Sequence, residues 1–153
     1  MKIGVISDTH GLLRPQAVAA LQGVDHILHA GDIGNVEIVA KLRNIAPVTA
    51  IRGNVDTHPD YHQFAATDAV ELGGKLFYLI HNVQQLDVVP GAAGIAAVIY
   101  GHSHKPEIKW DKNVLFFNPG SAGPRRFYLP IAVGTIQITA NGNIKPRIIE
   151  LKE

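Results

Sequence analysis

Short apolar segments separated by helical patterns recur along the first third of the chain. Apolar and β-branched side chains dominate residues 2–7, 26–30 and 47–51, a pattern typical of buried strands. Between them, residues 17–21 and 35–42 place apolar side chains at helical spacing, with Pro15 in the first turn of one helix and Asn35 as N-cap of the other. The alternation of strands and helices predicts a parallel sheet built from βαβ units.

The second half of the chain changes to short strands separated by turns. Residues 69–72 and 75–81 flank Gly73-Gly74, a pair that favours a tight hairpin. Further strands are predicted over 98–100, 107–110, 114–117, 131–138 and 145–151. Two sheets packed face to face with helices outside would satisfy this pattern, with the later strands largely antiparallel.

Composition restricts the class of protein. With 153 residues, 46% of them hydrophobic and 18% charged, the chain is predicted to form one soluble domain over residues 1–153. Lys and Arg total 14 against 13 for Asp and Glu, and no basic stripe is visible, so no dedicated nucleic-acid surface is expected. No apolar run approaches the roughly 20 residues that a membrane span needs, and the N-terminal run is too short for a signal peptide. We therefore expect a cytoplasmic protein with no membrane partner.

Residues of the metal-binding types follow five of the predicted strands. They are, in strand order, Asp8-Thr9-His10, Gly31-Asp32, Gly53-Asn54, His81 and Gly101-His102-Ser103-His104. Because ligands collect at the carboxyl ends of strands in such sheets, we expect these side chains to converge. Each motif alone has an ordinary alternative, such as a turn or a hydrogen-bonded polar residue at a strand end. Together they indicate a metal site, and the absence of cysteine leaves His, Asp, Glu and Asn as its ligands.

The glycines of these motifs have a predicted role of their own. Without a Cβ at Gly31, Gly53 or Gly101, the backbone can turn sharply after a strand and bring the next side chain close to the ions. The mixture of His and carboxylate suits Mn²⁺, Fe²⁺, Zn²⁺ or Ni²⁺ better than an all-oxygen Ca²⁺ cage.

From residue 3 to about residue 121, this series of motifs resembles the calcineurin-like metallophosphoesterase superfamily. The spacing, the small size and the later Asn118-Pro119-Gly120-Ser121 look most like its small bacterial and archaeal phosphodiesterase branch. The resemblance implies an α/β fold, namely a four-layer α/β/β/α sandwich of two mixed β-sheets flanked by helices. It also implies two divalent metal ions per chain, with Mn²⁺ favoured and Ni²⁺, Zn²⁺, Fe²⁺ and Mg²⁺ as alternatives. The implied ligands are Asp8, His10 and His104 at the first ion, Asp32 as the bridge, and Asn54, His81 and His102 at the second ion.

The reaction follows from the ions. Two metals about 3.5–4 Å apart bind phosphate oxygens, activate a bridging water and stabilise the entering and leaving oxygens. We therefore predict metal-dependent hydrolysis of phosphate esters, above all small-molecule phosphodiesters, by in-line attack of hydroxide on phosphorus. A phosphomonoesterase (including a protein phosphatase) is one alternative. A protein-binding scaffold of the retromer-subunit type, with a degraded metal site, is an alternative of a different class. A homo-oligomer is compatible with the sequence.

Two positions depart from the family's motifs. Many relatives have the sequence Gly-Asn-His-Glu at the third motif, and its His is proposed to protonate the leaving group. In this chain, Val55 occupies the position of that His. His58, on a loop stiffened by Pro59, becomes the candidate catalytic proton donor, and a solvated loop histidine is the alternative. Relatives often read His-Gly-His at the fourth motif, where Asn82 follows His81.

Overall fold

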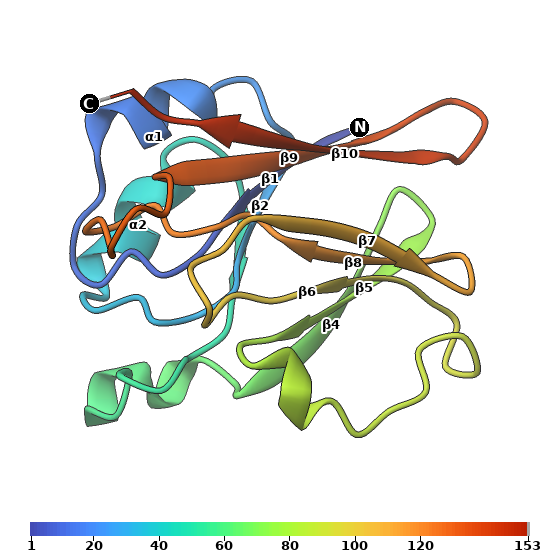
Figure 1. Cartoon of the computed structure of the whole chain (residues 1–153), viewed down its shortest axis with the longest axis horizontal. Helices are drawn as coiled ribbons and strands as arrows, with labels where there is room; N and C mark the ends of the chain where they lie inside the picture. Colours follow the sequence, from blue (N-terminus) through green and yellow to red (C-terminus); the bar gives the residue numbers. More distant parts are fainter. Residues whose placement is uncertain (153) are drawn as a thin grey trace.

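Two five-stranded sheets stacked face to face make up the computed structural model, which describes residues 1–152 (Figure 1). Sheet A has the strand order β10-β9-β1-β2-β3, and sheet B has the order β4-β5-β6-β8-β7. The strands are β1 (Lys2–Ile6), β2 (His26–His29), β3 (Val48–Ala50), β4 (Thr67–Leu72), β5 (Lys75–Ile80), β6 (Ile95–Ile99), β7 (Glu107–Asp111), β8 (Val114–Asn118), β9 (Ala132–Ile138) and β10 (Ile144–Glu150). The helices are α1 (Pro15–Ala20) and α2 (Glu37–Arg43), with 3₁₀ turns η1 (Pro59–Gln63) and η2 (Val83–Gln85).

Both sheets are mixed. Strands β1, β2 and β3 run parallel, as predicted for βαβ units, while β9 and β10 extend sheet A in antiparallel fashion. In sheet B the hairpins β4–β5 and β7–β8 are antiparallel, but β5, β6 and β8 are parallel to one another. The prediction of largely antiparallel later strands is therefore wrong for the centre of sheet B. The sequence separates these strands by long connections, which suit crossovers rather than hairpins.

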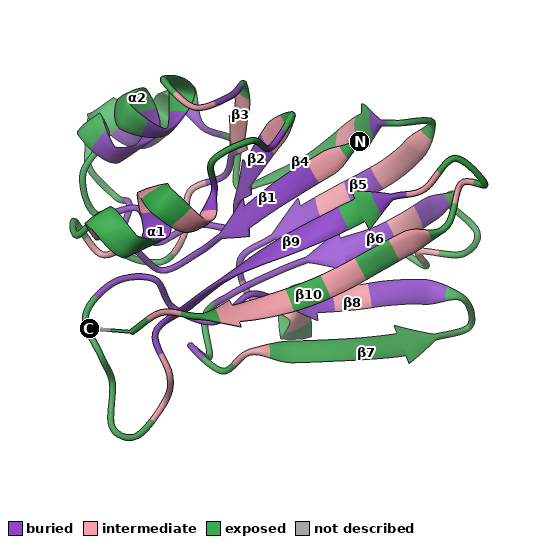
Figure 2. Cartoon of the chain, turned by 90° about the horizontal axis from the view of Figure 1, so that it is seen from above, coloured by how far each residue is buried: buried purple, intermediate pink, exposed green. Residues whose placement is uncertain are grey.

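The main core lies between the two sheets. Ile3 and Val5 of β1 face Phe77 of β5 and Phe117 of β8 within this apolar cluster, and all four are fully buried. Burial of each such side chain contributes roughly 1.5–3 kcal/mol. Figure 2 shows β1 and β9 buried along their lengths, whereas the edge strand β7 is exposed. The central strands are thus fixed in place by packing on both faces.

The outer faces of the two sheets are covered differently. Helices α1 and α2 pack on sheet A through residues such as Ala17 and Leu42. On sheet B, Val98 and Tyr100 are covered by η2 and the segment after it, including Leu86. The α/β/β/α sandwich is therefore confirmed, with a fourth layer that consists of a 3₁₀ turn and a loop in the described residues.

The local turn and capping chemistry mostly follows the sequence. Gly73 and Gly74 have φ of 57° and 79°, which is the left-handed conformation that the predicted tight hairpin requires. The assignment of Asn35 as an N-cap is wrong by one position, because Val36 is the N-cap of α2. The Asn35 Oδ1 nevertheless accepts a hydrogen bond from the Glu37 backbone N–H at 3.0 Å, so this side chain still caps the helix.

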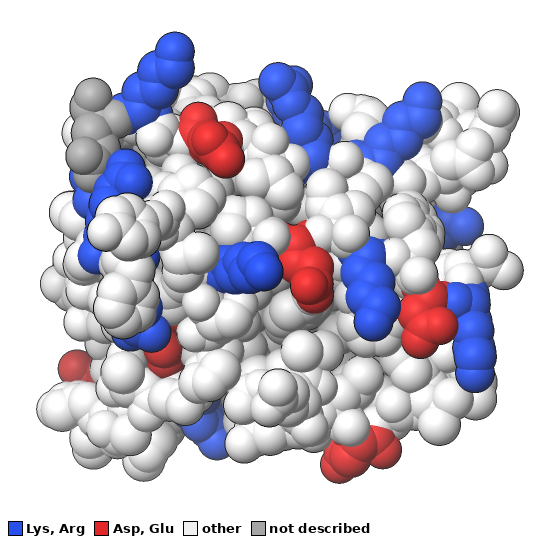
Figure 3. Space-filling view, viewed as in Figure 1, with Lys and Arg blue, Asp and Glu red and all other residues white. Residues whose placement is uncertain are grey.

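Charges of both signs are interspersed on the face drawn in Figure 3, with no large patch of one sign. Among the described residues, none of the helices has the length and apolar character that crossing a membrane would require.

Candidate metal centre

Five of the seven predicted ligands meet where β1, β2, β5 and β6 end. The Asp8 Oδ1 lies 3.4 Å from the His104 Nε2 and 3.7 Å from the His10 Nε2. The Asp32 Oδ2 lies 3.1 Å from the His81 Nε2 and 3.6 Å from the His10 Nε2. Two nitrogens bound to one tetrahedral ion at about 2.0–2.1 Å lie about 3.3 Å apart, close to the 3.2 Å between the Nε2 atoms of His10 and His104. The spacing is therefore compatible with binding of a cation.

Unpaired buried atoms point to the same conclusion. The Asp8 Oδ1 and the His81 Nε2 are buried without a hydrogen-bond partner. The other oxygen of Asp8 accepts hydrogen bonds from the Ser7 hydroxyl at 2.7 Å and from the His102 backbone N–H at 3.2 Å. The His81 Nδ1 donates to the Ala30 carbonyl at 2.7 Å, which leaves the lone pair of the neutral ring on Nε2. Both unpaired atoms thus carry lone pairs suited to a divalent cation.

The electrostatics of the cluster are those of tightly coupled charges. Burial raises the pKa of the Asp8 carboxyl, but the His10 and His104 rings outweigh burial and hold that pKa well below its ordinary value. The neighbouring Asp8 carboxylate raises the pKa of His10. Burial lowers the pKa of His81, but the Asp32 and Asp8 carboxylates and the Ala30 carbonyl together more than compensate and raise it. These carboxylates stabilise positive charge, whether it is carried by protons or by metal ions.

The ligands form two groups, each large enough to hold an ion. One group consists of Asp8, His10 and His104, and the other consists of Asp8, Asp32 and His81. The Asp32 Oδ2 lies between His81 and His10, which suits the bridging role implied by the family resemblance. The Asp8 Oδ1 also lies 3.8 Å from the His81 Nε2, so this carboxylate faces both groups as well. The bridging role of Asp32 stays a prediction.

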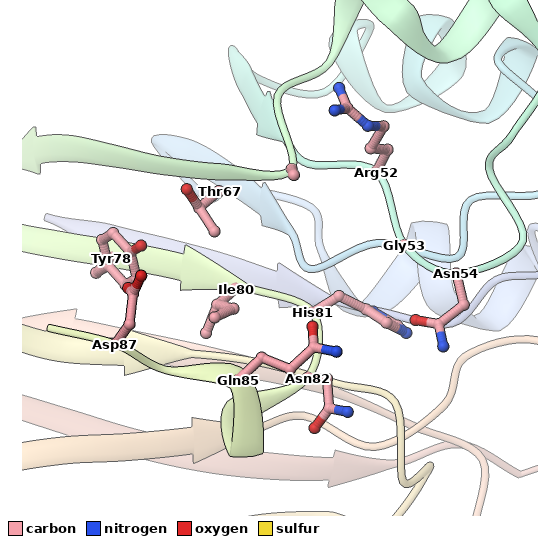
Figure 4. Close-up of a pocket in the computed structure, with 11 residues that line it drawn as sticks. Arg52, Gly53, Asn54, Thr67, Tyr78, Ile80, His81, Asn82, Gln85 and Asp87 are labelled. Atoms are coloured by element: carbon pink, nitrogen blue, oxygen red, sulfur yellow. The ribbon is translucent and has the colours of Figure 1, made fainter.

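The two remaining predicted ligands, His102 and Asn54, are exposed and lie beside His81. His102 is exposed, and its ring meets His81 edge-on with centroids 5.4 Å apart. Asn54 is also exposed, and Figure 4 shows its carboxamide turned toward the His81 ring. His58 is the N-cap of η1, where its Nδ1 accepts a hydrogen bond from the Asp60 backbone N–H at 3.1 Å. Asn82, which departs from the family motif, accepts a bond from the Gln84 N–H and caps η2.

The three motif glycines allow close approach around the site, in agreement with the sequence analysis. A Cβ on Gly53 would lie 2.3 Å from the Asp32 Oδ1, and a Cβ on Gly101 would lie 2.5 Å from the Asp8 Oδ2. A Cβ on Gly31 would lie 2.8 Å from the His81 Nδ1. A larger residue at any of these positions would displace a predicted ligand.

Sequence reasoning missed the residues that hold the ligand loops. The buried Asp56 carboxylate accepts three backbone hydrogen bonds, from Gly53 at 2.8 Å, Ile33 at 3.0 Å and Gly34 at 3.1 Å. It therefore ties the loop after β2 to the loop after β3. The Asn118 side chain donates to the Gly101 carbonyl at 3.1 Å and supports the loop after β6 in the same way. The signal for Asp56 was its position two residues after Asn54.

His29 is a buried histidine that hydrogen-bonds to the loops carrying the predicted ligands. Its Nδ1 accepts from the Gly31 N–H at 3.1 Å, and its Nε2 lies 3.1 Å from the Thr9 hydroxyl, which itself donates to the Ile33 carbonyl. Burial lowers the pKa of His29 to about 4, so the ring is neutral and supports the loops that carry the ligands.

Known proteins share both the sequence and the fold of this chain. A probable metallophosphoesterase of Methanothermobacter thermautotrophicus is 36% identical over 133 residues, which is 79% of this chain and 77% of that protein. The fold matches that of an archaeal phosphodiesterase with a TM-score of 0.76 at 25% identity, covering 97% of this chain and 100% of the other. It also matches Vacuolar Protein Sorting 29 from Cryptosporidium parvum with a TM-score of 0.76 at 19% identity, over 99% of this chain and 98% of that one. The sequence profile of the calcineurin-like phosphoesterase superfamily domain matches residues 1–141. The chain therefore belongs to the calcineurin-like phosphoesterase superfamily.

Proposed function

We propose that this protein is a phosphodiesterase that depends on two divalent metal ions and acts on small-molecule phosphodiesters. The observation that carries the proposal is the buried cluster in which the Asp8 Oδ1 and the His81 Nε2 have no hydrogen-bond partner while lying 3.1–3.8 Å from other ligand atoms. Such atoms are costly to bury unless a cation satisfies them. The cytoplasm is the compartment that we propose for this activity.

The chain's own residues supply binding and orientation. Metal ions bound here would polarise the phosphate oxygens and provide hydroxide at neutral pH. Asp8 and Asp32 bring the negative charge that holds such ions, and the Ala30 carbonyl fixes the His81 ring so that Nε2 faces the cluster. Asn54 and His102, exposed at the margin, would complete the second ion on the side from which a substrate approaches.

The residue after Asn54 bears on the choice of substrate. Val55 is 50% exposed at the position where many relatives carry the proposed proton-donating His. Because Val55 cannot donate a proton, departure of the leaving oxygen depends on the acidity of the alcohol or on another donor. We propose His58 as that donor and expect aryl diesters to be cleaved more readily than alkyl diesters.

A scaffold function is the alternative that the fold raises. The likeness to Vacuolar Protein Sorting 29 is at 19% identity and concerns the fold. Against a scaffold stands the ligand set, because all seven predicted positions keep residues able to bind a metal and five of them converge. A surface used only for protein contacts has no need of that cluster.

The test combines metal content with turnover. After chelation, the protein is reloaded separately with Mn²⁺, Mg²⁺, Zn²⁺ and Ni²⁺ and assayed with bis-p-nitrophenyl phosphate and with the monoester p-nitrophenyl phosphate. We expect two ions per chain, no turnover in the chelated protein, best or nearly best recovery with Mn²⁺, and faster cleavage of the diester. Full activity without metal would sink the mechanism, and faster monoester cleavage would favour a phosphomonoesterase. Stable metal binding with no turnover of either ester would favour the scaffold.

A further inference from the structure

A cavity of about 340 Å³ opens beside the predicted second ion and is shown in Figure 4. Asn54 and His81 line the end of the cavity next to the metal cluster, so a phosphate held at the cluster would lie at that end. Its walls come from β4, β5, and the segment that follows β5 through η2. The volume suits a small organic group rather than a macromolecule.

Polar side chains make up much of the rest of the lining of this cavity. They are Thr67, Tyr78, Asn82, Gln85 and Asp87. Within residues 1–152, the side chains of Thr67, Tyr78, Gln85 and Asp87 make no hydrogen bond. The Asn82 Oδ1 is used to cap η2, which leaves the amide NH₂ of Asn82 for a ligand. The cavity therefore offers both donors and acceptors.

The charge of the cavity is negative at its outer end. Figure 4 shows the Asp87 carboxylate near the Tyr78 ring, and the Arg52 guanidinium turned away from both. Arg52 donates instead to the carbonyl of Phe64, the residue after η1, so its charge is not directed into the cavity. A second phosphate or a carboxylate on the ligand would be repelled by Asp87, whereas hydroxyl groups can donate to it.

We propose that this cavity, through Asp87 and the amides of Asn82 and Gln85, binds a hydroxyl-rich alcohol group of the substrate, of the glycerol or sugar kind. The proposal rests on the phosphoesterase function, and it assigns the alcohol side of the diester to the cavity. Hydroxyls fit better than an ammonium group because Thr67, Asn82 and Gln85 present both donors and acceptors, whereas an ammonium group only donates. An aliphatic or aryl alcohol would displace water from these polar side chains without replacing its hydrogen bonds.

Two phosphonates test this assignment without turnover. The C–P bond of 3,4-dihydroxybutylphosphonate and of butylphosphonate resists ester hydrolysis, and the two ligands differ only in two hydroxyls. Isothermal titration with the Mn²⁺-loaded protein should show the dihydroxy ligand binding about tenfold or more tightly, the effect typical of a hydrogen bond to a charged group. Asp87→Ala should reduce this preference to about threefold or less. Both Asp87 and the control position Asp68 are exposed, so the fold should tolerate either substitution.

Asp68→Ala is the matched control, since it removes the same charge from β4 outside the cavity and should keep the full preference. Equal binding of the two phosphonates by the wild type, or an unchanged preference in Asp87→Ala, would overturn the proposal. Tighter binding of 3-aminopropylphosphonate than of the dihydroxy ligand would also overturn it, in favour of an amine. Cleavage of bis-p-nitrophenyl phosphate by the wild type reports the proposed function separately, so the two can fail independently.

Discussion

The predicted ligands adopt a backbone conformation that side chains seldom take. Positive φ angles occur at Asp8 (56°), His10 (45°), Asp32 (55°), His102 (72°) and His104 (63°). Only three other non-glycine residues within 1–152 share this feature. Each such residue costs of order 1–3 kcal/mol, and strain of this kind concentrates at functional sites. This backbone conformation sets the direction in which each of these side chains leaves the end of its strand.

At the same scale, the Asp32→Asn variant tests the bridging charge. The Asp32 Oδ1 accepts the Val55 N–H at 3.0 Å, and an Asn could keep that bond while placing a neutral amide where Oδ2 faces His10 and His81. We expect turnover of bis-p-nitrophenyl phosphate to fall by about 10³-fold or more, because the bridging charge helps to set the nucleophile. Asp68→Asn, at an exposed position on β4 outside the cavity, is the charge-matched control. Near wild-type turnover with both ions retained would mean that Asp32 is not the bridge.

The role of His58 is tested by separating its capping of η1 from its proposed donation of a proton. Its Nδ1 caps η1, and its side chain is 65% exposed beside Asp60. General acid catalysis is worth about 10²–10⁴-fold, but only where the leaving group needs a proton. His58→Asn retains a capping acceptor and removes the proton donor. It should therefore slow an alkyl diester by at least about 10²-fold while leaving an aryl diester and the metal content nearly unchanged.

His58→Ala completes the comparison, because it removes the cap as well. If His58→Asn behaves like the wild type on both diesters while His58→Ala loses activity on both, the residue acts through loop structure. No loss in either variant would make His58 a solvated loop histidine.

Among the elements, the loops after β2 and β3 depend on Asp56. Its carboxylate accepts three backbone N–H groups, and burial leaves no water to replace it. Because each buried unsatisfied group costs roughly 1–3 kcal/mol, Asp56→Ala should lower the free energy of unfolding by about 3 kcal/mol or more. Metal affinity should fall with it, since these loops carry Asp32 and Asn54. Urea unfolding and metal titration measure the two effects, and an exposed control such as Asp60→Ala should change neither. Unchanged metal affinity in Asp56→Ala would show that the loops hold their shape without it.

The sequence predicts an element well where its structure depends on residues that are neighbours in the chain. The hydrophobic pattern located every strand to within a few residues, and Gly73-Gly74 specified its hairpin, because both depend on neighbouring residues. The parallel pairing of β6 with β8 depends on a crossover around β7, which no local pattern encodes. The same holds for the site. Its ligands stand next to strand ends in the sequence, whereas the contacts of Asp56 with Ile33 and Gly34 join residues more than 20 positions apart.

For the whole molecule, the position of the metal cluster between the sheets matters most. Asp8, His10 and Asp32 follow strands of sheet A, whereas His81 and His104 follow strands of sheet B. Ions bound by these residues would join the two sheets, so metal binding should stabilise the fold as a whole rather than one loop. No hydrogen bond within the described residues satisfies the buried Asp8 Oδ1 and His81 Nε2, which such ions could bind.

Denaturant unfolding with and without Mn²⁺ tests this linkage. An ion present at 100 times its dissociation constant adds about 2.7 kcal/mol per site to the free energy of unfolding. For a domain of this size, each kcal/mol raises Tm by roughly 2–4 °C. We therefore expect Mn²⁺ to raise the urea midpoint at an unchanged m-value and to raise Tm by about 5 °C or more. Asp8→Asn should lose most of this gain, because the carboxylate of Asp8 faces both ligand groups. A midpoint insensitive to Mn²⁺, or an equal gain in Asp8→Asn, would show that the cluster does not couple the sheets through bound metal.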